Sequence, residues 1–89
     1  MNAIITVVGT DKVGIIAKVS AFLAERCINI EDISQTVLSG NFVMMMMVNL
    51  GSSSKALEEI KLELNDLGDT LNVSISLMHE KVFSAMHRI

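Results

Sequence analysis

The fold is decided by residues 39–50, which read Ser39-Gly40-Asn41-Phe42-Val43-Met44-Met45-Met46-Met47-Val48-Asn49-Leu50. The first three residues are of the types that form tight turns. The rest, from Phe42 to Leu50, is almost entirely apolar, so an extended chain here is apolar on both faces. A short run of this kind is typical of a strand at the centre of a sheet. Residues 39–50 therefore predict a hairpin turn followed by a central strand.

Three further elements are expected on the N-terminal side of this turn. Residues 29–39 alternate less cleanly and carry several polar side chains, which favours an edge strand. Residues 14–26 have apolar side chains at three- and four-residue steps, which predicts a helix packed on one side. The helical stripe consists of Ile15, Val19, Phe22 and Leu23, with Ile16 beside it. Residues 3–8 are β-branched and apolar on both faces, which predicts a second central strand.

The C-terminal half repeats the order of helix and strand. We expect Ser53 or Ser54 to cap a second helix and Gly68 to end it. The apolar stripe of this helix is Leu57, Ile60, Leu64 and Leu67. Residues 72–78 alternate between apolar and polar side chains, which predicts a fourth strand. Residues 79–89 carry Val82, Phe83, Met86 and Ile89 at helical spacing, which predicts a short amphipathic tail that docks on another surface.

The predicted order is β-α-β-β-α-β, two βαβ-type halves joined at the hairpin. Right-handed crossovers place both helices on one face of a four-stranded antiparallel sheet, with the first and third strands in the middle. We therefore predict an α+β fold, a ferredoxin-like sandwich. It forms one domain over residues 1–89, with residues 79–89 as its short C-terminal helical tail.

The face of this sheet that carries no helix is also predicted to be apolar. Either Val43, Met45 and Met47 or their alternates Met44 and Met46 must point to it. An apolar patch of this size in water promotes association. Covering it with a second copy is the simplest solution, so we expect a homodimer or a higher oligomer.

Composition excludes several classes of function. The chain has 89 residues with a net charge of −3, three Phe and neither Tyr nor Trp. An acidic chain without aromatic platforms is not expected to bind nucleic acid or an acidic membrane. No apolar run approaches a membrane span, and the single Cys27 suits a reducing compartment, so we expect a cytoplasmic protein.

The turn Gly9-Thr10-Asp11-Lys12-Val13-Gly14 is the segment most suited to binding. It follows a strand and opens a helix, so its backbone N–H groups can receive an anion such as a carboxylate. Asn29 opens the next strand and carries both donors and an acceptor. The alternative interpretation is structural, with Asp11 as an N-cap and Gly14 for packing. Because the third strand separates the first two, the sequence does not ensure that Asp11 and Asn29 are close within one subunit. In a dimer the two residues can instead meet across the interface.

Other candidate residues favour structural interpretations. His79, Glu80 and His87 lack the spacing that closes a metal shell, so no metal is expected. Methionines 44–47 are expected to fill the core or a dimer contact. Cys27 is expected to be a small buried residue at a helix end. No nucleophile–base arrangement can be assembled, so neither an enzyme nor a cofactor is predicted.

The chain resembles the ACT domain family, the small regulatory module found in many enzymes of amino-acid metabolism. The resemblance rests on a strand that ends in Gly9-Thr10-Asp11-Lys12-Val13-Gly14-Ile15, a helix, and Ile28-Asn29-Ile30 at the start of the second strand. It covers the whole chain and is closest to small stand-alone ACT proteins similar to the glycine-cleavage regulator. The terminal Met86-His87-Arg88-Ile89 is also similar to the ending of that group.

The resemblance implies a dimer that binds an amino acid or a similar small metabolite between its subunits. Carried onto this chain, it implies a ligand-binding site made of Thr10, Asp11, Lys12, Val13, Gly14 and Asn29. Serine-binding members have Asn at the position of Asp11 and His at the position of Gly9. An Asp there favours an ammonium group over a carboxylate, or caps the helix.

Two functions are therefore expected to compete. The first is a regulatory homodimer that senses an amino acid and acts on a separate protein partner. The alternative is a protein–protein interaction module, in which the tail and the sheet face bind a partner without any small ligand.

Overall fold

A computed structural model describes residues 2–10, 14–51 and 56–82. The elements are β1 (Asn2–Gly9), α1 (Ile15–Glu25), β2 (Asn29–Leu38), β3 (Asn41–Asn49), α2 (Leu57–Leu71) and β4 (Ser74–His79). The strands form one antiparallel sheet in the order β2-β3-β1-β4. The predicted βαββαβ order, with the first and third strands central, is confirmed. The predicted bounds of the four strands and of α1 differ from these by at most two residues.

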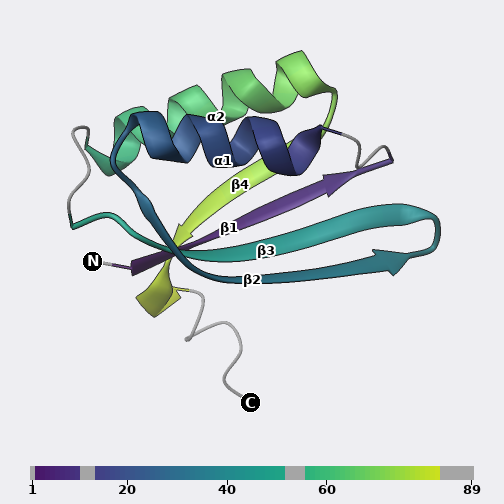
Figure 1. Cartoon of the computed structure of the whole chain (residues 1–89), viewed down its shortest axis with the longest axis horizontal. Coiled ribbons are helices and arrows are strands. Elements are labelled where there is room, and N and C mark those ends of the chain that lie inside the picture. The colour runs from purple at the N-terminus through teal and green to yellow at the C-terminus, as the bar shows by residue number, and fades with distance from the viewer. Residues whose placement is uncertain (1, 11–13, 52–55, 83–89) are drawn as a thin grey trace.

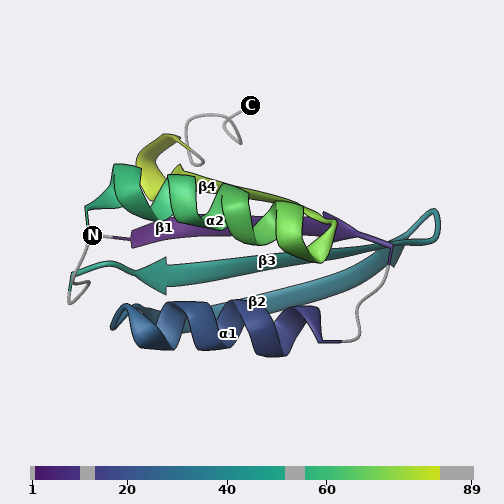
Figure 2. The ribbon, with the colours of Figure 1, turned by 90° about the horizontal axis from the view of Figure 1, so that it is seen from above.

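The molecule has two layers (Figure 1), and both helices lie side by side on one face of the sheet (Figure 2). The core fills the space between the layers. Its fully buried side chains come from both central strands and both helices: Ile5, Val7, Val19, Leu23, Met44, Met46, Val48, Ile60 and Leu64. The methionine run thus supplies two core residues, Met44 and Met46. Their flexible side chains fill the irregular space between the helices and the sheet, as a close-packed core requires.

The sheet face without helices, which we call the open face, contains the alternate residues of each strand. Met44 and Met46 are buried under the helices, whereas Val43, Met45 and Met47 are half-buried on the open face. The β1 residues paired with those three are Val8, Thr6 and Ile4. The choice left open by the sequence is therefore settled in favour of Val43, Met45 and Met47.

The C-terminal end of α1 explains why one prediction was wrong. Cys27 has a φ of 59° and is exposed, not buried. Its N–H donates to Ala24 O over 3.1 Å, and the N–H of Ile28 donates to Leu23 O over 3.0 Å. These are the two bonds of a Schellman motif, in which the residue after the cap takes the left-handed conformation and points into solvent. The buried position belongs to Ile28, which is 5% exposed.

Both predicted ends of α2 were also wrong. The helix begins after Ala56, an N-cap without a side-chain hydrogen bond, whereas Ser53 and Ser54 lie outside the described residues. It continues past Gly68 to Leu71 and ends at Asn72, whose φ is 58°. Gly68 is instead buried within α2, against the segment that leads into β4. A Cβ at this position would lie 2.8 Å from a backbone oxygen of that segment, so only glycine fits. Its role is close approach between helix and strand.

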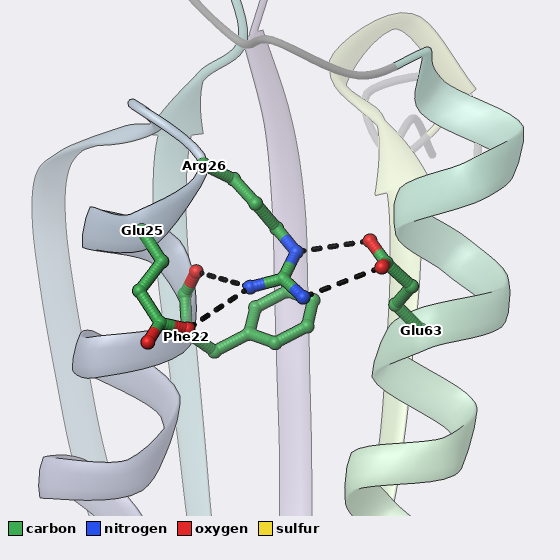
Figure 3. A network of polar contacts seen from close by, with 4 residues as sticks. All are labelled: Phe22, Glu25, Arg26 and Glu63. Atoms are coloured by element: carbon green, nitrogen blue, oxygen red, sulfur yellow. Dashed lines mark hydrogen bonds and ion pairs between the residues drawn. The ribbon is translucent and has the colours of Figure 1, made fainter.

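Arg26 links the two helices (Figure 3). Its guanidinium donates to both carboxylate oxygens of Glu63 on α2, over 2.9 and 3.3 Å, and to Phe22 O over 2.9 Å. The guanidinium carbon also lies 3.6 Å from the centre of the Phe22 ring. The hydrogen bond to Glu63 raises the pKa of Arg26 above its ordinary value. The sequence analysis missed this link, because Arg26 and Glu63 are 37 residues apart in the chain.

The tail prediction is only partly covered by the structure. Residues 80–82 form a helical turn directly after β4, on the side of the sheet away from the helices (Figure 1). Val82 in this turn is 50% exposed. Phe83, Met86 and Ile89 lie outside the described residues.

Candidate functional site

The predicted binding turn lies where β1 leads into α1. Thr10 directly follows β1 and is exposed, and Gly14 is the N-cap of α1 with a φ of 81°. Asp11, Lys12 and Val13 lie outside the described residues. Because Gly14 occupies the N-cap position itself, the alternative interpretation of Asp11 as the N-cap residue is wrong.

Gly14 gives this turn two properties that suit a ligand. Its positive φ is the conformation that glycine adopts without steric cost. Among the residues that the structure describes, a Cβ at Gly14 would also meet no atom within 4 Å. The first helical hydrogen bond is donated by the N–H of Lys18 to Gly14 O over 2.9 Å. The N–H groups of residues 15–17 therefore have no acceptor within the helix, and they point toward the turn.

Asn29 is not part of this cluster within one copy of the chain. It pairs with Asn49, which in turn pairs with Asn2 at the beginning of β1. Thr10 and Gly14 lie beyond the other end of β1. Eight residues of strand separate the two ends, a length of about 25 Å. A single copy therefore brings Thr10 and Gly14 together and leaves Asn29, which is exposed, at the opposite end of the sheet.

A cavity of about 720 Å³ lies at the same end of the sheet as Thr10. It is formed by the end of β1, the last two turns of α2 and the start of β4. The polar residues that line it are Thr10, Asn65, Asp69, Asn72 and Ser74. Sequence reasoning missed this cavity, although Asn65, Asp69 and Asn72 follow a helical spacing of four and three residues that signals one polar side of α2.

Two other kinds of site find no support in residues 2–10, 14–51 and 56–82. These ranges contain no group of three or more His, Cys, Asp or Glu side chains that could hold a metal ion. Among the same residues, no helix is long and apolar enough to cross a membrane.

The layers and strand order define a ferredoxin-like α/β sandwich. The profile of the ACT domain family matches residues 2–78, so the chain belongs to the ACT domain family. Its relatives include UPF0237 proteins. Those of Listeria innocua and of Clostridium acetobutylicum are 47% and 49% identical, each over the full length of both chains.

Solved structures give the same result. An ACT domain protein from Streptococcus pneumoniae is 46% identical and has a TM-score of 0.84, with 93% of each chain covered. A protein described as a candidate transcriptional repressor of the glycine cleavage system is 25% identical, with a TM-score of 0.77 over 85% of this chain. The chain spans 44% of that protein's length. Membership of this family, with a regulator among its structural neighbours, supports a regulatory role for the chain.

Proposed function

We propose that this chain is a regulatory module that binds an amino acid between two copies of itself and acts on a separate protein. The proposed site combines Thr10, Asp11, Lys12, Val13 and Gly14 of one subunit with Asn29 of the partner subunit. The observation that carries the proposal is the unpaired edge of the sheet at β2, where such a dimer would form.

The edge of β2 has the features of a strand that pairs with another copy. Ile33 and Val37 are 38% and 63% exposed, although both point to the helix-covered side of the sheet, opposite the buried Met46 and Phe42. An exposed, apolar edge strand is a template for further strand pairing. If two β2 strands pair antiparallel about Gln35, Ile33 faces the partner's Val37 twice by symmetry. Glu31 and Asp32 then face no carboxylate, so the pairing carries no charge repulsion.

Antiparallel pairing through β2 would also join the separated halves of the site. Because the partner strand runs in the opposite direction, its beginning lies toward the end of the sheet where β1 stops. Asn29 of the partner subunit is thereby brought to the end at which Thr10 and Gly14 lie. Because about 25 Å separates Asn29 from Thr10 and Gly14 within one copy, a site that uses all three residues requires two copies.

The chemistry of the two halves suits an amino acid. The N–H groups at the start of α1, which have no acceptor within the helix, favour a carboxylate, and the space that the described residues leave beside Gly14 admits it. The carboxamide of Asn29 can donate to the same carboxylate or accept from an ammonium group. Asp11 provides a carboxylate for that ammonium group. A zwitterion satisfies both requirements at once, whereas a purely anionic metabolite would oppose Asp11.

The test is calorimetric titration of the protein with the common amino acids and with folate-pathway metabolites. We expect saturable binding of at least one amino acid. Asn29→Ala should weaken that binding about 10- to 100-fold, the effect of losing one or two hydrogen bonds to a charged group. Asn65→Ala, a matched change in the cavity beside Thr10, is the control and should leave affinity unchanged.

A mixed dimer tests whether the site is shared between subunits. Gly14→Asp places a carboxylate where the ligand's carboxylate is expected. The described residues leave room for its side chain, and Asp is one of the few residues other than glycine that visit the left-handed conformation of Gly14, although at some cost in strain. Neither this variant nor Asn29→Ala should bind well alone. A dimer of one copy of each variant has one intact site, so it should recover half of the wild-type stoichiometry. No recovery, or a loss of binding in Asn65→Ala instead, would contradict a shared site, and silence across the panel would contradict ligand binding.

A further inference from the structure

The open face of the sheet carries fewer ionisable side chains than the outer sides of the two helices, and its two central strands contribute none. The register places four rows of side chains on it, and the ionisable ones are carboxylates at the β2 edge: Asp32, and Glu31 at the bulge, which accepts a hydrogen bond from Asn49 Nδ2 over 3.4 Å. The central positions are Ile4, Thr6, Val8, Val43, Met45 and Met47. By contrast, the outer sides of α1 and α2 carry Lys18, Glu25, Glu58, Glu59, Asp66 and Asp69, all exposed.

This pattern restricts what can cover the face. A membrane surface or a nucleic acid would require a cluster of cationic side chains, whereas the described cation on this side of the sheet is Lys81 alone, in the helical turn after β4. An apolar centre with hydroxyl groups along both margins is complementary to itself. The margins are Ser34 and Thr36 on β2 and Ser74 and Ser76 on β4. A second copy of the same face therefore offers both apolar contact at the centre and hydroxyl partners at the rim.

The size of the face also fits a second copy. Four strands about 4.8 Å apart, each rising about 3.3 Å per residue over eight residues, cover about 500 Å². Two such faces in contact bury on the order of 1,000 Å², which reaches the lower range of specific interfaces. A hollow of about 200 Å³ beside Ile4, Met45 and Met47 leaves room for a side chain of the partner. Flexible methionines adapt well to such a contact.

We infer that the open face packs against the open face of a second copy, as two stacked sheets do at a distance of about 10 Å. This contact is separate from the β2 edge and goes beyond the dimer of the proposed function. Where both contacts form, two β2-paired dimers stack into a closed tetramer.

Sedimentation velocity of the full chain and three variants tests this inference. Met45→Lys places a charge at the centre of the open face, and Val37→Lys places one on the β2 edge. Leu62→Lys is the control, since Leu62 is 66% exposed on α2 and belongs to neither surface. We expect a wild-type mass of four times 9.7 kDa, which each of the first two variants halves and the control leaves unchanged. Val8→Lys, at a position 37% exposed, replaces Met45→Lys should that variant fail to fold.

The outcomes separate this inference from the proposed function. A wild-type dimer that resists Met45→Lys but dissociates with Val37→Lys overturns the open-face contact and leaves the β2 dimer intact. A wild-type dimer with the reverse sensitivity supports the open-face contact and contradicts β2 pairing. Truncation after Val82 tests another occupant. If self-association through the face appears only after truncation, residues 83–89 cover the face and the inference is overturned.

Discussion

Replacement of Cys27 by Gly should make the protein more stable. Cys27 takes the left-handed conformation, with φ at 59°, because the two hydrogen bonds that end α1 require it. This conformation costs a residue with a Cβ about 1–2 kcal/mol, and it costs glycine nothing. Since the Cys27 side chain is exposed, its removal loses no buried contact.

The net gain is smaller than the relief of strain. A glycine adds freedom to the unfolded chain, which offsets about 0.4–1 kcal/mol. We therefore expect Cys27→Gly to raise the free energy of unfolding by about 0.5–1 kcal/mol. For a domain of this size, that corresponds to a rise in Tm of about 3–6 °C.

Thermal and urea unfolding, followed by circular dichroism in the presence of a reductant, measure this change. Cys27→Ala is the matched control, because it removes the thiol and keeps the Cβ. Its Tm should stay close to that of the wild type. A rise in Tm for Cys27→Ala equal to that for Cys27→Gly would show that the thiol, not the backbone conformation, is responsible. No rise for Cys27→Gly would refute the strain argument itself.

Two further predictions concern packing between the layers. In an exposed helix, a Gly→Ala change raises the free energy of unfolding by about 1 kcal/mol. At Gly68 the new Cβ lies 2.8 Å from a backbone oxygen, so we expect Gly68→Ala to lower the free energy of unfolding, measured in urea, by about 1–2 kcal/mol. An increase would mean that α2 and β4 move apart freely. A double-mutant cycle of Arg26→Ala and Glu63→Ala should give a coupling of about 1 kcal/mol in the free energy of unfolding. Both side chains are less than a third exposed, and they share two hydrogen bonds. Because the pKa of Arg26 is raised, the guanidinium keeps its charge through neutral pH, and its side of the pair is lost as the pH rises into strong alkali. Additive single effects would contradict the coupling.

Much of the fold could be predicted from the sequence because local patterns and global topology agree here. Apart from Asn49 near its end, the run 42–50 has no polar side chain that could face water, so it had to be central. The 14–26 stripe could only be a helix with one buried side. Once a hairpin joined two βαβ halves, the handedness of crossovers determined the strand order β2-β3-β1-β4.

The wrong predictions all fell at helix ends, where one residue rule competes with another. Glycine commonly ends helices, yet Gly68 is needed inside α2 for close packing, and Asn72 takes the left-handed conformation in its place. Cysteine is commonly buried, yet Cys27 occupies a position that the hydrogen bonds of the helix end direct into solvent. Composition cannot decide such cases, because the deciding contact is the approach of the segment before β4 for Gly68 and the backbone hydrogen bonds at the end of α1 for Cys27.

The candidate site has a different difficulty, because its predicted halves lie on one chain but at opposite ends of its sheet. Sequence spacing alone left open whether Asp11 and Asn29 meet within one subunit. The register removes that possibility for Thr10, Gly14 and Asn29, since the whole length of β1 lies between them. If Asn29 binds a ligand together with this turn, the second half of the site must come from another copy. The exposed apolar edge of β2 is thus more than an association hazard: it is the surface through which an incomplete site would be completed, and ligand binding and subunit pairing would then stabilise each other.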